Sequence, residues 1–521
     1  MTPARRRSSI LTALFVACSV LALVAQQAAV PPSDYVREHY TKYEYQVPMR
    51  DGARLFTSVY VPKTCDSPYP IMLNRTPYSV GPYGVDNFRT EVGPSEHFMK
   101  EGFIFAYQDV RGRYMSEGTW VEVRPHNPAK TSRTDTDEST DTWDTVDWMV
   151  KHLPCNNGKI GMWGISYPGF YVSAGMIDAH PALVAVSPQA PVTDYYLGDD
   201  AFHNGAFMLA ANYGFYTFFK PRPGDPQPPG PRPSFDGGPP DGYEFYLALG
   251  PLWEGSTRSG INENPYWRLN LDHTTYDDFW KARSIWRHFK NIGPAVLTVG
   301  GWFDAEDLMG PLRTYKTLRD ASPKTDNRLV MGPWTHGSWA RGEGQRVGNI
   351  DVGQPASAHF RASLEFPFFM ARLKGAQAAD VAPVTVFETG TNRWRTFDVW
   401  PPATAQARTY YLRASGGLSA ESPVEEDAHD EYVSDPNRPV PYVGHVQMGM
   451  QSDYMTEDQR FAARRTDVLV YQTPVLDEDL TVLGPITVDL HVSTSGTDAD
   501  FVALTELGGR VAVQLDRTSV V

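Results

Sequence analysis

The stretch of residues 158–169, Gly-Lys-Ile-Gly-Met-Trp-Gly-Ile-Ser-Tyr-Pro-Gly, constrains the fold more than any other part of the chain. Its apolar residues 160–163 predict a short buried strand, and the residues that follow predict a sharp turn at Ser166 and a helix from about Phe170. A serine held on such a strand-to-helix turn is typical of a nucleophile elbow. The stretch therefore predicts both a local geometry and a reactive hydroxyl group.

Two glycines flank this turn for a steric reason. A Cβ atom at Gly164 or Gly169 would collide with the neighbouring strand or helix. The common spacing of the motif is Gly-x-Ser-x-Gly, whereas here Pro168 occupies the second glycine position and Gly169 follows it. Proline fits there because its fixed φ suits the first turn of a helix. On its own, the motif is also compatible with an ordinary turn rich in glycine and serine.

Strand and helix patterns alternate over residues 43–189. A helix with Thr140 as its N-cap precedes the strand at 160–163, and earlier strands are predicted at residues 45–48, 55–61, 70–74 and 103–109. Apolar strands resume at residues 294–299 and 329–331. This alternation predicts an α/β fold with a mostly parallel sheet that is covered on both faces.

Three residues with catalytic side chains each follow a predicted strand. Ser166 follows the strand at 160–163, Asp304 follows the strand at 294–299, and His336 follows the strand at 329–331. Open α/β sheets place their sites at the carboxyl ends of strands, and the order Ser, Asp, His is that of the α/β-hydrolase arrangement. Taken singly, such an aspartate is usually a turn residue and such a histidine a surface residue. The three together favour a catalytic triad.

Composition divides the rest of the chain. Aromatic helical stretches predict a helical cap at residues 190–289, inserted between two parts of an α/β-hydrolase domain at 30–189 and 290–377. Within the cap, residues 221–240 are dense in proline and glycine and predict an extended surface loop.

A second domain is predicted at residues 378–521, where apolar residues recur at every second position. Short strands separated by turn-rich stretches are typical of a β-sandwich. The strands are predicted at residues 384–388, 409–413, 468–471 and 486–493.

The first 29 residues have the pattern of a secretory signal peptide, with three arginines at positions 5–7 and an apolar run at 10–25. That run is shorter than the ~20 residues that span a bilayer. We therefore expect a periplasmic or secreted protein, and lipid modification of Cys18 stays open. No other stretch is long and apolar enough to predict a membrane span.

The net charge is −14, and loss of the three arginines with the signal takes it to about −17. So acidic a protein is a poor partner for nucleic acids and anionic membranes. Two further cysteines, Cys65 and Cys155, each precede a predicted strand. If these strands are parallel neighbours, a disulfide between the two cysteines is geometrically plausible, and two unrelated buried thiols are the alternative.

Five motifs together resemble the cocaine-esterase-like group, which joins X-prolyl dipeptidyl-peptidases, cocaine esterase and the α-amino acid ester hydrolases. They are Gly164-x-Ser166-Tyr-x-Gly169, Asp109-Val-Arg-Gly-Arg113, Gly301-Trp-Phe-Asp304, Gly332-Pro-Trp-x-His336, and Trp394-Arg with Trp400-Pro-Pro402. The resemblance spans residues 43–502. It implies an α/β-hydrolase domain, a helical cap and a jelly-roll β-sandwich, with no cofactor or metal, in a homotetramer.

Within this group the chain is most similar to the α-amino acid ester hydrolases, also called β-lactam antibiotic acylases. In these enzymes a cluster of three acids binds the α-ammonium group of a small-molecule substrate. The resemblance implies that Glu306, Asp307 and Asp200 form this cluster here, with Asp199 as the alternative to Asp200. Cocaine esterase lacks the cluster. Another esterase of the group, an X-prolyl dipeptidyl-peptidase, or a non-catalytic relic are the other hypotheses.

The resemblance also implies an oxyanion hole. Its donors are the backbone N–H of Tyr167 and the hydroxyl of Tyr78 in the motif Arg-Thr-Pro-Tyr. By spacing alone, Tyr78 is an aromatic turn residue. Past Val502 the family's motifs fade, so we expect a truncated or frameshifted carboxyl terminus and an incomplete jelly-roll.

Overall fold

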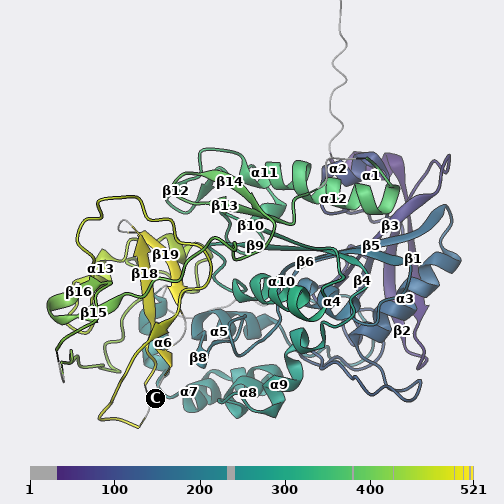
Figure 1. The fold of residues 1–521 in the computed structure, drawn as a ribbon. Helices are drawn as coiled ribbons and strands as arrows, with labels where there is room; N and C mark the ends of the chain where they lie inside the picture. Colours follow the sequence, from purple (N-terminus) through teal and green to yellow (C-terminus); the bar gives the residue numbers. More distant parts are fainter. Residues whose placement is uncertain are drawn as a thin grey trace, which may run out of the picture.

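The computed structural model describes residues 32–231, 241–377, 381–425, 428–497, 499–507, 510–515 and 518–519. A ten-stranded sheet lies at its centre, in the order β1-β2-β4-β3-β5-β6-β9-β10-β13-β14 (Figure 1). The predicted signal peptide, with Cys18, lies outside the described residues.

The sheet is parallel in the middle and antiparallel at its two edges. β1 (Tyr40–Pro48) and β2 (Arg54–Pro62) form an antiparallel hairpin, and β14 (Arg393–Phe397) is antiparallel to the strand beside it. The parallel strands are β4 (Ile104–Asp109), β3 (Tyr69–Thr76), β5 (Asn156–Ser166), β6 (Leu183–Pro191), β9 (Ala295–Gly301), β10 (Asn327–Gly332) and β13 (Val384–Glu388). The predicted α/β-hydrolase class is confirmed.

Helices cover both faces of the sheet because the strands are apolar on both sides. Core residues of α3 (Glu138–His152), α4 (Tyr167–Gly175) and α10 (Met309–Ala321) pack on one face. The other face is covered by α1 (Pro32–His39), α2 (Glu96–Glu101), α11 (Ala356–Phe360) and α12 (Phe366–Phe369), as Figure 1 shows.

Two helix boundaries differ from the sequence prediction. The N-cap of α3 is Asp137, whose carboxylate accepts from the backbone N–H of Thr140, while the Thr140 hydroxyl accepts from the backbone N–H of Asp137. Thr140, predicted as the cap, is thus the second partner of a capping box. In addition, α4 begins at Tyr167 rather than near Phe170, so the helix starts directly at the turn.

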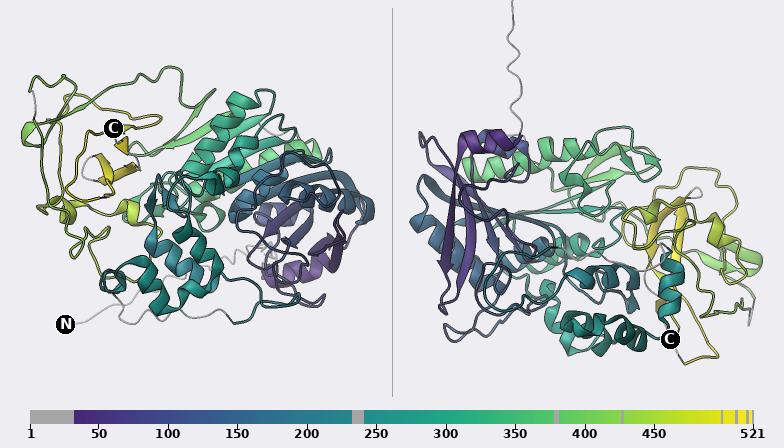
Figure 2. Two further views of the ribbon diagram at one scale, coloured as in Figure 1. Left: turned by 90° about the horizontal axis from the view of Figure 1, so that it is seen from below. Right: turned by 180° about the vertical axis from the view of Figure 1, so that it is seen from behind.

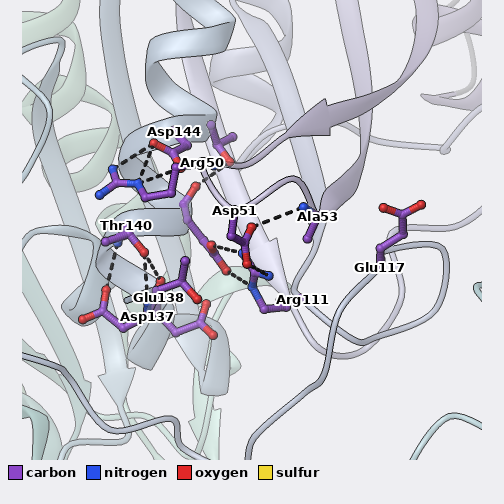
Figure 3. Close-up of polar contacts among 12 residues, drawn as sticks. Arg50, Asp51, Ala53, Arg111, Glu117, Asp137, Glu138, Thr140 and Asp144 are labelled. Atoms are coloured by element: carbon purple, nitrogen blue, oxygen red, sulfur yellow. Dashed lines mark hydrogen bonds and ion pairs between the residues drawn. The ribbon is translucent and has the colours of Figure 1, made fainter. Parts of the chain in front are cut away.

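Partly buried ion pairs connect the amino-terminal half of α3 to the β1–β2 hairpin and to the loop after β4 (Figure 3). Arg111 bridges Asp51 in the hairpin turn and Asp141 in α3, at 2.8 and 2.7 Å. Arg50 pairs with Asp144 at 2.8 Å. Arg111 and Asp141 are buried, whereas Arg50 and Asp51 keep partial contact with solvent.

A disulfide joins Cys65 and Cys155, with their Cα atoms 5.8 Å apart. The two residues lie just before the adjacent parallel strands β3 and β5. Of the two alternatives that the sequence left open, the disulfide is the one present in the structure.

The segment between β6 and β9 is mainly helical, as predicted for the cap, and begins with the small hairpin of β7 (Phe202–His203) and β8 (Ala206–Phe207). Residues 221–231 contain neither helix nor strand, and the rest of the predicted loop lies outside the described residues. The helices are α5 (Leu209–Phe218), α6 (Gly242–Leu249), α7 (Leu252–Ser259), α8 (Pro265–Asp272) and α9 (Asp278–Arg283), with 3₁₀ turns at Ile261–Glu263 and Ile285–His288.

The sequence predicts the strand at Val384–Glu388 as part of the separate sandwich, and this prediction is wrong. As β13 it pairs in parallel with β10 and continues the main sheet, because its side chains are buried on both faces. Residues 468–471 form no strand, and within 486–493 only Val488–Asp489 pairs. Alternation of apolar residues predicted strands there, but a strand also needs a partner edge.

The described carboxyl-terminal strands pair two by two. The pairs are β15 (Tyr411–Arg413) with β16 (Gly417–Ser419), β17 (Val488–Asp489) with β20 (Thr518–Ser519), and β18 (Ala503–Leu507) with β19 (Arg510–Leu515). A jelly-roll stays a prediction. This part lies beside the cap (Figure 2), where the backbone N–H of Gly242 in α6 donates to the carbonyl of Gln447 at 2.7 Å.

Over the described residues, no helix combines the length and the apolar character that crossing a bilayer requires.

Candidate active site

Ser166 lies at the turn between β5 and α4 with φ 65° and ψ −127°, a conformation that non-glycine residues rarely adopt. A Cβ at Gly164 would lie 2.4 Å from the carbonyl oxygen of Pro168, and one at Gly169 would lie 2.7 Å from that of Gln189. The steric argument drawn from the sequence therefore holds. Pro168 lies in the first turn of α4, as expected.

The loops after β9 and β10 are joined backbone to backbone. The N–H of Phe303 donates to the carbonyl of Trp334 at 3.0 Å, and a Cβ at Gly301 would lie 2.2 Å from the same oxygen. This close approach brings His336 to Asp304: Nδ1 lies 2.9 and 3.0 Å from the two carboxylate oxygens. The carboxylate therefore fixes the orientation of the ring.

His336 also lies beside the elbow. A Cβ at Gly337 would lie 3.5 Å from the Cγ2 atom of Ile165, so the residues next to His336 and Ser166 are in van der Waals range. The imidazole makes no hydrogen bond to the Ser166 hydroxyl among the described residues. Catalytic hydrogen bonds are often loose before substrate binds.

Two further acids approach the same imidazole. Asp304 Oδ1 accepts from the backbone N–H groups of Glu306 and Asp307, each at 3.0 Å, and so folds the turn that carries both. A Glu306 oxygen lies 3.8 Å from His336 Nε2, and an Asp307 oxygen lies 3.9 Å from Nδ1. Asp307 is fully buried, and neither of its carboxyl oxygens has a hydrogen-bond partner among the described residues.

Asp200 adds a fourth carboxyl group from the loop after β6. Its charge acts on Glu306 and His336, and its backbone is held at φ 26°. Asp199 instead uses one oxygen within its own loop, accepting from the backbone N–H groups of Thr193 and Asp194 at 2.7 and 2.9 Å. Between the two alternatives from the sequence, Asp200 therefore faces the histidine.

The crowding of acids shifts several pKa values at the site. Burial and the neighbouring carboxylates, Glu306 foremost for Asp200 and Asp200 foremost for Asp307, hold the pKa values of Asp200 and Asp307 well above the ordinary range. Burial opposes the imidazolium form of His336, but Asp304, Glu306 and Asp200 outweigh it and raise its pKa to about 10. Burial also opposes ionisation of Asp304, yet the charge and hydrogen bond of His336 keep its pKa low.

Tyr78 lies over the residue that follows the serine. Its ring packs edge-on against Tyr167, Phe215 and Phe219, at centroid distances of 6.3, 6.3 and 5.7 Å. It stays 39% exposed, yet the protein around it and the charge of Asp200 raise the pKa of its hydroxyl strongly. Tyr78 is therefore part of the same group of residues as the acids.

Sequence reasoning assigned no role to the motif at residues 109–113, which holds the Tyr78 loop in place. Arg113 donates to the carbonyl of Pro77 at 3.0 Å and to that of Lys220, beyond α5, at 2.7 Å. Asp109 accepts from the backbone N–H of Val80 at 3.0 Å. The sequence identifies the motif only as a family signature, because the partners of Arg113 lie far away in the chain.

Sequence reasoning also missed Glu122, which carries no motif. It is buried beneath Tyr167, and its carboxylate accepts hydrogen bonds from the hydroxyl groups of Tyr167, Tyr195 and Tyr216 at 3.3–3.4 Å. Burial raises the pKa of its carboxyl to about 7. Across the described residues, no group of three or more His, Cys, Asp and Glu side chains is arranged to hold a metal ion.

Comparison with known proteins places this site in a family. The model of the X-Pro dipeptidyl-peptidase (S15 family) matches residues 51–338, and that of the X-Pro dipeptidyl-peptidase C-terminal non-catalytic domain matches 376–508. The chain belongs to the S15 family. The resemblance seen in the motifs is confirmed.

Relatives within and around the S15 family agree with this. A cocaine esterase from Rhodococcus sp. (strain MB1 Bresler) is 28% identical over 485 residues, which cover 88% of this chain and 78% of that protein. A solved α-amino acid ester hydrolase is 33% identical with a TM-score of 0.77, covering 89% of this chain and 77% of its own. An aminopeptidase from a marine sediment Thaumarchaeota archaeon is 34% identical with a TM-score of 0.76, and the match covers 87% of this chain and 74% of that one. The protein is a serine hydrolase of the S15 family.

Proposed function

We propose that this serine hydrolase cleaves α-amino acid esters and α-amino β-lactam amides through an acyl-enzyme on Ser166. His336 takes the proton of the Ser166 hydroxyl as the oxygen attacks the acyl carbon, and then gives it to the leaving alcohol or amine. Asp304 holds the imidazole in the required tautomer and stabilises its cation. Water then releases the acid, or the amine of a β-lactam nucleus takes the acyl group.

The negative charge of the tetrahedral intermediate requires donors. The backbone N–H of Tyr167, at the start of α4, and the hydroxyl of Tyr78 serve as the oxyanion hole in this proposal. The raised pKa of Tyr78 keeps its proton in place as a donor at neutral pH. Loss of one such donor typically costs ~3–4 kcal/mol of transition-state stabilisation.

The observation that carries the proposal is the unpartnered carboxyl group of Asp307 beside Glu306 and Asp200. Buried acids without partners are costly, so their retention points to a cationic ligand. An ammonium group supplies both charge and three donors. At ~4 Å and an effective dielectric constant of ~20, each carboxylate contributes ~4 kcal/mol at most.

The closeness of these acids to the histidine favours an α-amino group over a more remote one. Glu306 and Asp307 lie within 3.9 Å of the imidazole that works on the acyl carbon. The amino terminus of an X-prolyl dipeptide lies one residue further away, and an extended residue spans ~3.5 Å. An X-prolyl dipeptidyl-peptidase is therefore the weaker candidate.

The test compares phenylglycine methyl ester with its N-acetyl form. We expect the free amine to react at least a hundredfold faster in kcat/KM, and Asp307→Asn to remove most of that preference. Equal rates for the two esters would exclude an ammonium pocket. Release of dipeptides from an Xaa-Pro-nitroanilide would instead favour the dipeptidase.

The cellular location and assembly belong to the proposal as well. The Cys65–Cys155 disulfide supports a periplasmic or secreted location, because such bonds persist in oxidising compartments. A homotetramer is proposed from the family resemblance alone. Size-exclusion chromatography with light scattering tests it directly.

A further inference from the structure

We infer that Glu306 makes the catalytic base depend on the substrate: in the empty site its carboxylate keeps a proton on His336, and the substrate's ammonium group, by pairing with Glu306, releases that proton. The inference rests on the proposed function and gives Glu306 a second task. Beyond binding the amine, it sets how fast Ser166 reacts at a given pH.

The geometry around the imidazole is the first argument. Nδ1 is fixed by Asp304 at 2.9 Å, which leaves Nε2 as the nitrogen that must accept the serine proton. Glu306 faces that nitrogen at 3.8 Å, while no hydrogen bond joins the imidazole to Ser166 among the described residues. Glu306 therefore stabilises a proton on Nε2, the nitrogen that must be unprotonated to act as the catalytic base.

The charges that face His336 come from two loops. Asp304, Glu306 and Asp307 lie on the loop after β9, and Asp200 lies on the loop after β6. The elbow between β5 and α4 contributes the neutral Ser166. Acidic groups thus surround the ring, and the resulting pKa of about 10 means that the ring is protonated at pH 7.

The acids do not share this task equally. Burial and the neighbouring acids raise the pKa values of Asp200 and Asp307 well above the ordinary range, so their charged forms are disfavoured. The Glu306 side chain is 32% exposed, so water reaches it. Asp304 orients the ring at Nδ1 whether or not Nε2 carries a proton. Glu306 is thus the carboxylate whose charge an incoming cation can offset, and this weakens the hold of Nε2 on its proton.

The substrate's ammonium group changes this balance. When it pairs with Glu306, its positive charge offsets the carboxylate and the pKa of His336 falls. The imidazolium proton passes to water, and the neutral Nε2 can then accept the proton of the attacking hydroxyl. Esters without an amine find the base protonated, so discrimination appears in the rate of acylation and its pH dependence as well as in binding.

A neutral alkyl fluorophosphonate tests the inference without any amine. Its reaction forms a bond between Ser166 Oγ and phosphorus and expels fluoride, while His336 accepts the hydroxyl proton. In the wild type we expect the inactivation rate constant to rise about tenfold per pH unit from pH 7 and to level near pH 10. In Glu306→Gln the midpoint should fall by about 1–3 pH units, so the variant reacts about tenfold faster or more at pH 7.

Asp320→Asn is the charge-matched control, because Asp320 is half-exposed on α10 and pairs with Lys316 and Arg319. It should keep the wild-type profile. Superimposable profiles for wild type and Glu306→Gln, or equal shifts in both variants, would overturn the inference. A preference for N-acetylated esters would contradict the proposed function. The pH profile of the fluorophosphonate reaction would still test whether Glu306 changes the pKa of His336.

A second measurement does not depend on any variant folding. In protein labelled with ¹³C at histidine Cε1, the His336 resonance should titrate near pH 10 in the free enzyme. Addition of phenylglycinol, which carries the amine but no acyl group, should lower that midpoint by at least one pH unit. An unchanged midpoint with the ligand bound would contradict the inference.

Discussion

Asp304 shows how much one side chain can organise. The same carboxylate accepts from the imidazole of His336 and from the backbone N–H groups of Glu306 and Asp307. The orientation of His336 and the placement of Glu306 and Asp307 are therefore coupled. Removal of the Asp304 carboxylate would disturb the turn as well as the chemistry, so smaller changes at other residues report better on the role of each side chain.

Tyr78→Phe is one such change. It removes a single hydroxyl group from a partly exposed ring whose packing against Tyr167 and Phe219 is kept. We expect kcat for phenylglycine methyl ester to fall about 10²- to 10³-fold with little change in KM, because the donor acts on the transition state. Tyr43→Phe, on the exposed edge strand β1, should leave kcat unchanged. A fall of less than threefold in Tyr78→Phe would remove this hydroxyl from the oxyanion hole.

At the scale of elements, Arg113 links three segments: the loop after β4, the Tyr78 loop and the end of α5. Its guanidinium bonds to two carbonyl groups and lies 4.3 Å from the ring centroid of Phe219. The ammonium group of a lysine cannot reproduce the planar, forked arrangement of N–H donors by which the guanidinium holds both carbonyl groups. We expect Arg113→Lys to lower kcat/KM for the ester about tenfold or more through misplacement of Tyr78. Arg54→Lys, at an exposed ion pair with Glu117, should change it less than twofold.

A second link between elements gives a pH-dependent stability. Glu365, in the π-helical turn Arg361–Glu365, accepts from Gln189 at the end of β6, and Gln189 accepts from Trp339 beyond His336. Burial raises the pKa of Glu365 from 4.5 to about 7. The folded state thus holds this proton more tightly than the unfolded state, so the contribution is full below pH 4.5 and is lost as the pH rises towards 7.

Glu365→Gln removes that titration while keeping an acceptor for Gln189. Relative to wild type, its free energy of unfolding should therefore rise by about 2–3 kcal/mol between pH 5 and pH 8.5. Urea denaturation at the two pH values measures the difference. A constant difference between the two proteins would show that Glu365 does not titrate in this range.

These links explain where sequence reasoning succeeds and where it fails. The elbow could be predicted because much of its constraint is local in sequence: a Cβ at Gly164 would meet Pro168 in the next turn, although Gly169 faces Gln189 on β6. Both Asp137 and Thr140 are good N-caps, and spacing alone did not separate them. The partners of Arg113 lie 36 and 107 residues away, and no local pattern encodes such contacts.

At the scale of the whole molecule, the disulfide closes a loop of 90 residues around β3, β4 and α3. In the chain-entropy model, such a cross-link stabilises the folded state by about 4–5 kcal/mol. Cys65→Ser with Cys155→Ser should therefore lower the melting temperature by several degrees and make the protein sensitive to urea. Treatment with a reducing agent should have the same effect on the wild type and none on the double variant.

The carboxyl-terminal part is where whole-molecule prediction from sequence was weakest. Alternating apolar residues at 468–471 and 486–493 suggested strands, but Leu469 and Val470 are exposed and the segment lies outside a ladder. By contrast, β13 had the same pattern and joined the main sheet because the edge of β10 was open to it. Periodicity identifies extended chain, whereas pairing depends on the neighbouring strand.

The central claim is that Ser166 is acylated by substrates whose free α-amino group enters the acid cluster. Mass spectrometry of acid-quenched enzyme tests it most directly, after mixing with phenylglycine methyl ester or with its N-acetyl form. The account predicts one phenylglycyl group on the peptide that contains Ser166, formed from the free amine only and absent in Ser166→Ala. An acyl group on another residue, or equal acylation by the N-acetyl ester, would contradict it.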